Sequence, residues 1–285
     1  MPIKVLQSAL SRRVYPPTPE QVNCSELNFT YQKSFSSTIK LLSYNIQVGI
    51  NTQLYRHYIT RGWQHLFPNA GRVRNLNRIA DLLAEFDLVA LQEIDGGSIR
   101  TGFINQAEYL AVKGHFPFWY QQLNRNLGKI AQQSNGLLSR FKPSEMEDHK
   151  LPGLISGRGA IVAYFGHKSS PLVVIVMHLA LGQRVRNMQL SYIRDLIQGY
   201  QHIVLMGDMN THAEQLLNDS PLRDTPLQSV HWDKNTFPSW NPKRSLDHIL
   251  ISPLLKVKQV EVLNVPISDH LPIAVEIELP DYFRT

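Results

Sequence analysis

Apolar residues along this chain are grouped in short runs, each of which ends in polar or turn-forming residues. Runs of this length that are rich in valine, isoleucine and leucine are typical of β-strands. We predict strands over 39–48, 87–92, 135–139, 159–165, 171–179, 202–207, 246–251, 257–263 and 271–279. Many strands with short connections favour an architecture in which two sheets pack together.

Helical periodicity is confined to a few segments. Between residues 72 and 86, the side chains of Val73, Leu76, Ile79 and Leu83 fall on one helical face. Residues 183–198 repeat this pattern, and residues 104–113 predict a shorter helix. Few helices and many strands predict an α+β or α/β sandwich with the helices outside the sheets.

The first 38 residues differ in composition from the rest of the chain. Residues 1–38 are rich in Ser, Pro, Thr and Gln, and the prolines within 15–19 exclude a helix there, so we predict an irregular N-terminal extension. The main folded domain is expected to span residues 39–285. The polar segment 211–243 is too long for a plain connector, and long loops of this kind usually bind something.

The composition is that of a globular protein and not of a disordered chain. Of the 285 residues, 43% are hydrophobic and 18% charged, and no apolar run approaches the ~18–20 residues that cross a bilayer. Because no secretory signal is recognisable and Cys24 is the single cysteine, we expect a cytoplasmic protein, or one exported without such a signal, that has no internal disulfide. The net charge of +6 favours a polyanionic partner, although the basic residues are scattered.

Several predicted strands end in a carboxylate, an amide or an imidazole. Asp208 and Asn210 follow the strand 202–207 and, being two residues apart, point to the same side. Together they could hold a water molecule and a phosphate oxygen. A turn after a strand has the same composition, and the short motif alone does not distinguish the two.

An acidic residue ends another strand. Glu93 follows the apolar run 88–92, where an unpaired carboxylate would be costly to bury, so it should bind a metal ion or pair with an arginine. We expect Asp95, two residues further on, to be its exposed partner in a loop.

Two acid–imidazole pairs stand at strand ends. Neighbouring side chains in a strand point oppositely, so we expect Asp247 to bond His270 across strands and to favour its protonated form. Asp269 is then free to bind a metal ion or metal-bound water. His248 should point into the sheet packing and have a structural role.

Four further polar or aromatic positions could contribute. His178 ends an apolar run, and Asn45 ends another, where a buried amide needs several partners. A lone histidine in such a run is more often a satisfied core residue. Asn135 could bind substrate or form a turn, and Trp240 could stack on a base or an acyl chain or simply anchor its loop.

As an ordered set, these motifs resemble the DNase I-like endonuclease/exonuclease/phosphatase superfamily over about residues 39–279. The resemblance implies a four-layer α/β sandwich with two central, mostly antiparallel β-sheets flanked by helices. It also implies hydrolysis of a phosphate ester with a divalent cation, usually Mg²⁺, with Mn²⁺ as an alternative. Glu93 would be the direct metal ligand, with Asn45 and Asp269 close to it.

The resemblance also implies catalytic roles. Asp208 would orient or deprotonate the attacking water while Asn210 helps to hold the phosphate. His178, and His270 paired with Asp247, would contact the scissile phosphate. Two departures concern neighbouring positions: Gln47 stands where many nucleases have an acid, and 132–134 lack the acid that DNase-like members use to orient the first histidine.

The motifs and the resemblance together predict a Mg²⁺-dependent phosphodiesterase or phosphatase in which water attacks a phosphate ester in line. The basic charge slightly favours a nucleic-acid substrate. A lipid-directed activity, on sphingomyelin or a phosphoinositide, is the alternative, and a catalytically inactive binding module is a third. No obligate protein partner is evident from the sequence.

Overall fold

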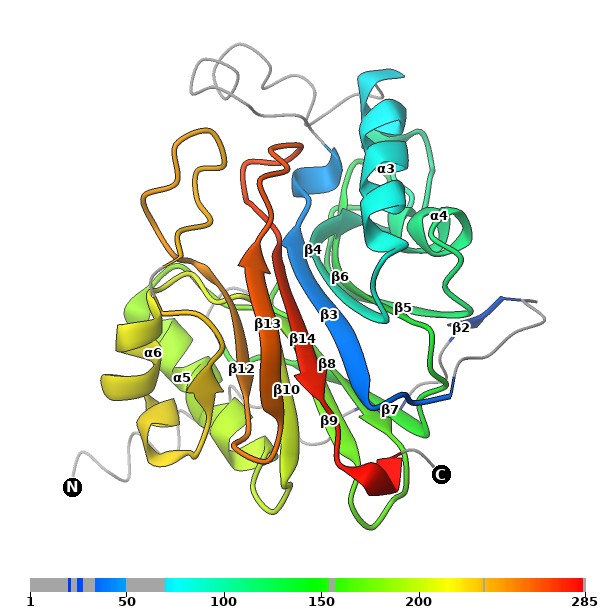
Figure 1. Ribbon diagram of the computed structural model, residues 1–285. Helices are drawn as coiled ribbons and strands as arrows, with labels where there is room; N and C mark the ends of the chain where they lie inside the picture. The colour runs from blue at the N-terminus through cyan, green and yellow to red at the C-terminus, as the bar shows by residue number, and fades with distance from the viewer. Residues whose placement is uncertain are drawn as a thin grey trace.

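The structure is a computed structural model that describes residues 20–21, 25–27, 34–49, 70–153, 157–232 and 234–283. Most of the predicted N-terminal extension, including Cys24 and the prolines of 15–19, lies outside the described residues. Within them, two seven-stranded sheets form the centre of the molecule (Figure 1). No helix among them is long and apolar enough to cross a membrane.

The first sheet carries the strands that lead into the motif residues of the second half of the chain. Its only parallel pair in the described residues is β9–β10, and the other pairs are antiparallel. The spatial order is β1 (Glu20–Gln21), β7 (Glu145–Lys150), β8 (Gly159–Phe165), β9 (Leu172–His178), β10 (His202–Asp208), β12 (Asp247–Ile251) and β11 (Gln228–Ser229).

The second sheet is built in the same way, with β3–β4 as the parallel pair among its described strands. The spatial order is β13 (Lys256–Val262), β14 (Ile273–Glu278), β3 (Thr38–Asn45), β4 (Leu88–Asp95), β6 (Gln132–Ser139), β5 (Phe118–Asn126) and β2 (Ser25–Glu26).

Helices cover the two outer faces and complete four layers (Figure 1). The helices α5 (Gln183–Leu196) and α6 (Ala213–Asn218) pack on the first sheet, and α3 (Ala70–Leu83) and α4 (Gln106–Lys113) pack on the second. Single-turn 3-10 helices lie at Gln47–Gly49, Ile99–Thr101, Pro221–Asp224 and Asp281–Phe283. A third apolar cluster, which includes Val174, Val204 and Val275, fills the space between the sheets. The predicted four-layer sandwich is thereby confirmed.

Every predicted strand is present, most with shifted ends, but β5 and β7 escaped prediction. β5 and β7 contain many polar residues and only part of their side chains are buried, so they lack the apolar run that identified the others. Segment 211–243 is also less irregular than expected, because it contains α6 and β11. The helix expected at 72–86 ends at Leu83, and Val73 is 38% exposed.

One glycine allows the central strands of the first sheet to approach closely. Gly207 in β10 has a φ of +146°, and a Cβ atom there would lie 1.8 Å from the carbonyl oxygen of Met177 in β9. Only glycine tolerates both the dihedral angle and the contact. The register that results places Asp208 directly beside His178.

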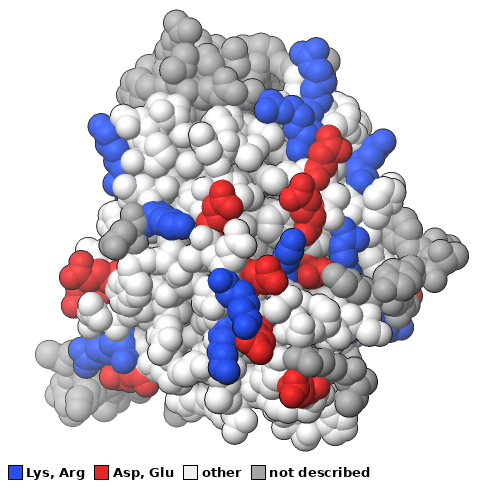
Figure 2. Space-filling view, viewed as in Figure 1, with Lys and Arg blue, Asp and Glu red and all other residues white. Residues whose placement is uncertain are grey.

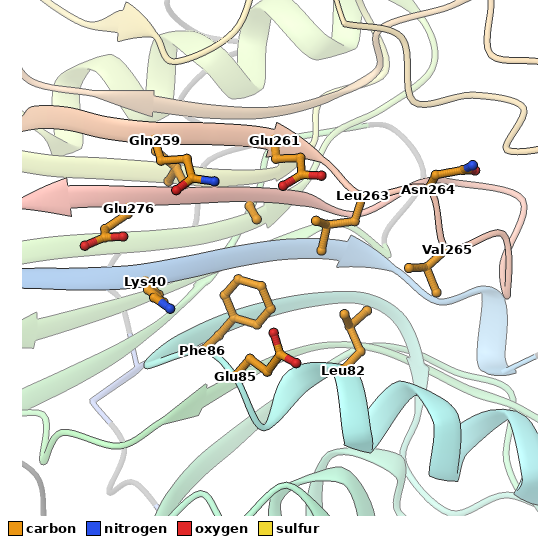
Figure 3. A pocket seen from close by; sticks show the side chains of 12 residues that line it. Lys40, Leu82, Glu85, Phe86, Gln259, Glu261, Leu263, Asn264, Val265 and Glu276 are labelled. Carbon is orange, nitrogen blue, oxygen red and sulfur yellow. The ribbon is translucent and has the colours of Figure 1, made fainter.

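A groove of about 370 Å³ remains on the outer face of the second sheet, where α3 does not cover β3, β13 and β14 (Figure 3). Glu85, Glu261 and Glu276 line it, together with Lys40 and apolar side chains such as Phe86. Because its three carboxylates outnumber its single ammonium group, the groove would repel a phosphate ester. This groove therefore does not fit the predicted chemistry.

Candidate functional site

The predicted site residues converge at one end of the two sheets. Strands β3, β4, β9 and β10 all end there, at the upper edge in Figure 1, and β12 begins there. Asp208 is the antiparallel partner of Asp247 in the sheet register and the parallel partner of His178. Residues distant in the sequence are thus brought together because parallel neighbours end at the same sheet edge.

Asp208 lies at the centre of this group and is 2% exposed. Its Oδ2 atom accepts a hydrogen bond from Nδ2 of Asn45 at 3.2 Å, across the two sheets. The same oxygen lies 3.4 Å from Nε2 of His178 and 3.9 Å from Nε2 of His270. One carboxylate oxygen therefore faces two imidazoles and an amide.

The expected hydrogen bond between Asp247 and His270 is present. Nδ1 of His270 lies 2.7 Å from Oδ2 of Asp247, and both side chains are buried. Thr236, which the sequence analysis did not single out, donates its hydroxyl to the same Oδ2 at 2.5 Å. The ring of Phe237 packs on His270 at a centroid distance of 4.9 Å, so the loop before β12 holds this imidazole in one orientation.

The two histidines have opposite electrostatic character. Burial and the charges of Arg158 and His270 lower the pKa of His178 well below its ordinary value. Burial also acts to lower the pKa of His270, but the charge and hydrogen bond of Asp247 outweigh it and raise that pKa well above its ordinary value. Burial and the charge of Asp247 raise the pKa of Asp208 to about 7. The site thus contains a cationic imidazole, a neutral one and a carboxyl group able to exchange a proton near neutrality.

Glu93 reaches the site through a β-bulge. The register of β4 against β6 shifts between Leu91 and Ile94, and Glu93 has a φ of +54°. Bulges of this kind re-aim a side chain at the end of a strand, and a positive φ is strained for a residue other than glycine. Burial, followed by the charge of Asp269, raises the pKa of Glu93, so two carboxylates lie close enough to repel each other.

Oxygen ligands that could hold a divalent cation lie around Glu93. The side chain of Asn45 contacts Glu93 as well as Asp208, and Asp269 is 4% exposed. Two neighbouring carboxylates and an amide oxygen are the donor types that Mg²⁺ and Mn²⁺ take in proteins, and a bound cation would relieve the repulsion between Glu93 and Asp269. The donor set therefore fits a hard divalent ion.

A second group of possible ligands is also present. Among the described residues, Asp208, Asp247 and His270 have ligand atoms within 4.8 Å of one another. The short contacts within this group are hydrogen bonds, at 2.7 Å between Asp247 and His270 and at 2.5 Å from Thr236 to Asp247. A cation there would have to displace the bond between Asp247 and His270.

The other predicted residues occupy different places. The amide of Asn210 donates to the carbonyl oxygen of Leu179 at 2.9 Å, and its backbone N–H donates to Oδ1 of Asp208 at 3.0 Å. Asn135 is 1% exposed, donates to Gly159 and lines the cavity beside His178. Trp240 is half-buried and is not among the residues that line this cavity.

The cavity beside Glu93 and His178 has a volume of about 160 Å³ and contains an arginine that the sequence analysis missed. Arg158 lines it together with Glu93 and His178, and its charge acts on Glu93 and Asp208. Arg158 precedes a buried strand in a glycine-flanked turn (Gly157 and Gly159), and no local pattern distinguishes it from other arginines. Only the packing of β8 beside β9 brings it to the site.

The expectation that Asp95 is exposed is wrong, because its side chain is completely buried. Oδ2 of Asp95 forms a 2.5 Å ion pair with Nε of Arg100. The carboxylate also accepts hydrogen bonds from the backbone of Gly97 and Ser98 and from the hydroxyls of Ser98 and Thr101. Burial acts to raise the pKa of Asp95, but the Ser98 N–H and Arg100 outweigh it and lower the pKa. The turn after β4 is thus folded around a buried carboxylate.

Replacing Asp95 by alanine is therefore expected to destabilise the protein by about 3–5 kcal/mol, because Arg100 is left as an uncompensated buried charge. Urea denaturation followed by circular dichroism measures this difference. The exposed carboxylate of Asp195 pairs with its neighbour Arg194, and Asp195→Ala serves as the control with an effect below about 1 kcal/mol. Equal midpoints for the two variants would contradict the structural role of Asp95.

His248 points away from Asp247, as the strand alternation predicts. Its Nε2 lies 2.7 Å from the carbonyl oxygen of Thr211, and its ring stacks on that of His231 at a centroid distance of 5.4 Å. Both rings are buried. Burial, followed by the charge of His248, lowers the pKa of His231 to about 4.

This stack predicts a loss of stability in acid. His231 has a pKa of about 4 in the folded state and ~6.5 in the unfolded state, so it is protonated more readily when the protein is unfolded. Its contribution to stability is therefore complete above pH ~6.5 and is lost as the pH falls towards 4. The shift to about 4 corresponds to about 3 kcal/mol. We expect His231→Phe to lose less stability than the wild type between pH 7 and pH 4 in urea denaturation. An identical fall in both proteins would refute this.

Comparison with known proteins identifies the family of this chain. A sequence profile described as Endonuclease/Exonuclease/phosphatase family matches residues 42–270, whereas no curated protein sequence matches the chain. Among solved structures, an endonuclease/exonuclease/phosphatase from Beutenbergia cavernae is 17% identical with a TM-score of 0.65, the match covering 86% of this chain and 72% of that one.

Two other structures have more specific descriptions. A mannosyl-6-phosphatase from Bacteroides thetaiotaomicron is 17% identical with a TM-score of 0.61, over 85% of this chain and 100% of that one. TDP2 from D. rerio, in complex with a single-stranded DNA product, is 15% identical with a TM-score of 0.61, over 86% of this chain and 100% of that one. At these identities the structures establish the shared fold. Because the family profile covers most of the chain, this protein belongs to the endonuclease/exonuclease/phosphatase family of phosphoesterases.

Proposed function

We propose that this protein is a divalent-cation-dependent phosphodiesterase that acts by in-line attack of water, with nucleic acid as the favoured substrate. The observation that carries the proposal is the position of the Asp208 carboxylate, whose Oδ2 faces His178 at 3.4 Å, His270 at 3.9 Å and Asn45 at 3.2 Å. A phosphate ester needs an activated water and neutralisation of its non-bridging oxygens. The residues around Asp208 supply both functions.

Asp208 is the proposed proton acceptor. Its pKa of about 7 matches the range in which general bases are most effective, and the backbone N–H of Asn210 fixes the orientation of its carboxylate. His270, held protonated by Asp247, would donate a hydrogen bond to a non-bridging phosphate oxygen. His178 would donate through Nε2 as a neutral imidazole. Arg158 adds a positive charge on the wall of the cavity.

Glu93, Asp269 and Asn45 would hold the cation, Mg²⁺ or Mn²⁺. When bound, the ion would neutralise charge on the phosphate and favour departure of the leaving oxygen. The charge of Asp269 acts on Glu93 and the side chain of Asn45 hydrogen-bonds Glu93, so the three side chains form one group of oxygen ligands. Asp208 remains outside this set, free for proton transfer.

The preference for nucleic acid is supported by charge and by the relatives. The net charge is +6, and TDP2 was solved with a single-stranded DNA product. Figure 2 shows basic and acidic side chains interspersed on the visible face, without a continuous basic tract. A short or flexible nucleic-acid segment fits this distribution better than a long duplex that requires many phosphate contacts.

The reaction is tested with bis-p-nitrophenyl phosphate. We expect release of nitrophenolate with Mg²⁺ or Mn²⁺, its loss on addition of EDTA, and its return when the metal is restored. Glu93→Ala should abolish activity at saturating metal, and Glu108→Ala, an exposed glutamate on α4, is the matched control. Absence of turnover of any phosphoester by the folded, metal-loaded protein would favour the binding-module hypothesis.

The substrate is identified with a panel of plasmid DNA, an abasic duplex, poly(A), sphingomyelin and phosphoinositides. Cleavage of a nucleic acid without lipid turnover would support the proposal. Turnover of lipid alone would refute the preference for nucleic acid while leaving the phosphoesterase chemistry in place.

A further inference from the structure

The turn that follows β3 has an unfavourable backbone conformation. Gln47 and Val48 have φ angles of +44° and +54°, and Gly49 continues at +72°. Glycine adopts this left-handed region freely, but other residues do so at a cost, above all a β-branched residue such as valine. Gln47 and Val48 are both buried. A strained conformation of this kind persists only where the surrounding contacts impose it.

This turn orients a proposed cation ligand. The backbone N–H of Gln47 donates to Oδ1 of Asn45 at 3.2 Å. On its other side, Nδ2 of Asn45 donates to Asp208 at 3.2 Å and the same side chain contacts Glu93. The amide of Asn45 is thus held from both ends, while its oxygen keeps a second lone pair for a cation. If the turn relaxed, the N–H of Gln47 would move and this hold on Asn45 would be lost.

Gln106 joins the turn to the strand that carries Glu93. Its side chain is completely buried. Nε2 of Gln106 donates to the carbonyl oxygen of Val48 at 3.0 Å, and Oε1 accepts the backbone N–H of Asp95 at 2.9 Å. Asp95 lies two residues after Glu93, which has a positive φ in the bulge of β4. One side chain therefore bonds both of the backbone segments that bring strained residues to the site.

The helix that presents Gln106 is itself anchored. Gln106 is the first residue of α4, and the side chain of Asn105 caps this helix by accepting the backbone N–H groups of Ala107 and Glu108. Ala107 and Leu110 pack in the apolar cluster under α4. Gln106 thus bonds the two segments from a fixed base, because a capped and packed helix start has little freedom to move.

We propose that Gln106 is a positioning residue that holds Asn45 and Glu93 in the arrangement that binds the divalent cation. This inference rests on the proposed function and deepens it. Because the fold holds the strained turn in place, the ligands do not have to be reorganised when the cation binds, and preorganisation of this kind increases affinity. Without Gln106, Val48 is free to relax to a negative φ and Asn45 loses its fixed orientation.

The proposal is tested by measuring cation binding without turnover. Gln106→Leu keeps the approximate size of the side chain and removes both hydrogen bonds. The dissociation constant of Mn²⁺ is measured from the EPR signal of the free ion, and Glu93→Ala identifies the bound Mn²⁺ that belongs to this site. We expect Gln106→Leu to weaken the affinity by about 10–100-fold, the usual effect of losing a residue that supports metal ligands.

The matched control is another buried glutamine that bonds two backbone groups. Gln189 on α5 accepts the N–H of Ala180 at 2.8 Å and donates to the carbonyl oxygen of Pro152 at 3.1 Å. Gln189→Leu should cost a similar amount of stability in urea denaturation, because it leaves the same two backbone groups without partners. Its Mn²⁺ affinity should stay that of the wild type. An equal loss of affinity in both variants would overturn the positioning role.

A double variant tests whether Gln106 acts through the strained turn. Glycine adopts a positive φ without strain, so Val48→Gly in the Gln106→Leu background should recover part of the lost Mn²⁺ affinity. An affinity as low as that of the single variant would refute the action through this turn. If Gln106→Leu does not fold, Gln106→Asn takes its place, because it is one methylene shorter and cannot reach both partners.

The outcomes separate this inference from the proposed function. If the wild type binds Mn²⁺ and the folded Gln106→Leu protein binds it equally well, the positioning role is overturned and the proposed function is unaffected. If the variant binds Mn²⁺ weakly as expected but the wild type hydrolyses no phosphoester, the proposed function fails and the positioning role stands. A wild-type protein that binds no Mn²⁺ would overturn both.

Discussion

Asp208→Asn is expected to reduce the turnover of bis-p-nitrophenyl phosphate by about 10²–10⁴-fold, the usual contribution of a positioned general base. The asparagine keeps the size of the side chain and can still accept the hydrogen bond from the backbone of Asn210, but it cannot take a proton from water. The measurement is kcat at saturating metal and substrate.

The same substitution should not unfold the protein. Because burial and the charge of Asp247 raise the pKa of Asp208 to about 7, the fold disfavours the charged carboxylate at higher pH. Stability is lost as the pH rises from the unfolded pKa of ~3.9 through the folded pKa of about 7, so a neutral asparagine should raise the free energy of unfolding at pH 8 in metal-free buffer. A folded variant that retains most of its activity would eliminate Asp208 as the base.

We expect His270→Ala to affect mainly the activity and His248→Ala to affect mainly the stability, although both residues follow an aspartate at a strand edge. His270→Ala should lower kcat by about 10²–10⁴-fold, because it removes the cationic donor that Asp247 holds beside Asp208. His248→Ala should retain activity but lower the free energy of unfolding by about 2–4 kcal/mol, because the ring is buried and stacked.

Both variants are measured for kcat and for urea-induced unfolding at pH 8, and each serves as the control for the other. A well-folded His248→Ala protein as inactive as His270→Ala would show that the side-chain directions in β12 are assigned wrongly. Full activity in His270→Ala would remove the Asp247–His270 pair from the mechanism.

Local sequence patterns were enough to identify most of the strands. The buried strands β8, β9 and β10 are continuous apolar runs, and each strand that carries a predicted site residue was recognised from such a run. Polar residues at the ends of these runs became candidates because a carboxylate or imidazole after an apolar strand requires a partner. β5 and β7 were missed because their sequences contain many polar residues and no apolar run.

The partners of those residues were decided only by the tertiary structure. Asp95 and Glu93 are two residues apart and chemically similar, yet the bulge in β4 directs Glu93 towards Asp269 and leaves Asp95 buried in the following turn. No periodicity in the sequence predicts the bulge, since it depends on the register with β6. Arg158 and Thr236 were likewise identified only by what they contact.

The sequence by itself therefore determined which segments are strands and which polar side chains stand at their ends, because both depend on neighbours along the chain. The tertiary structure decided which of these side chains meet. Asp208 faces His178 because Gly207 lets β10 approach β9, and His270 reaches Asp247 because the chain returns to the same sheet edge. Such contacts depend on strand order and register, which are set by packing between residues far apart in the sequence.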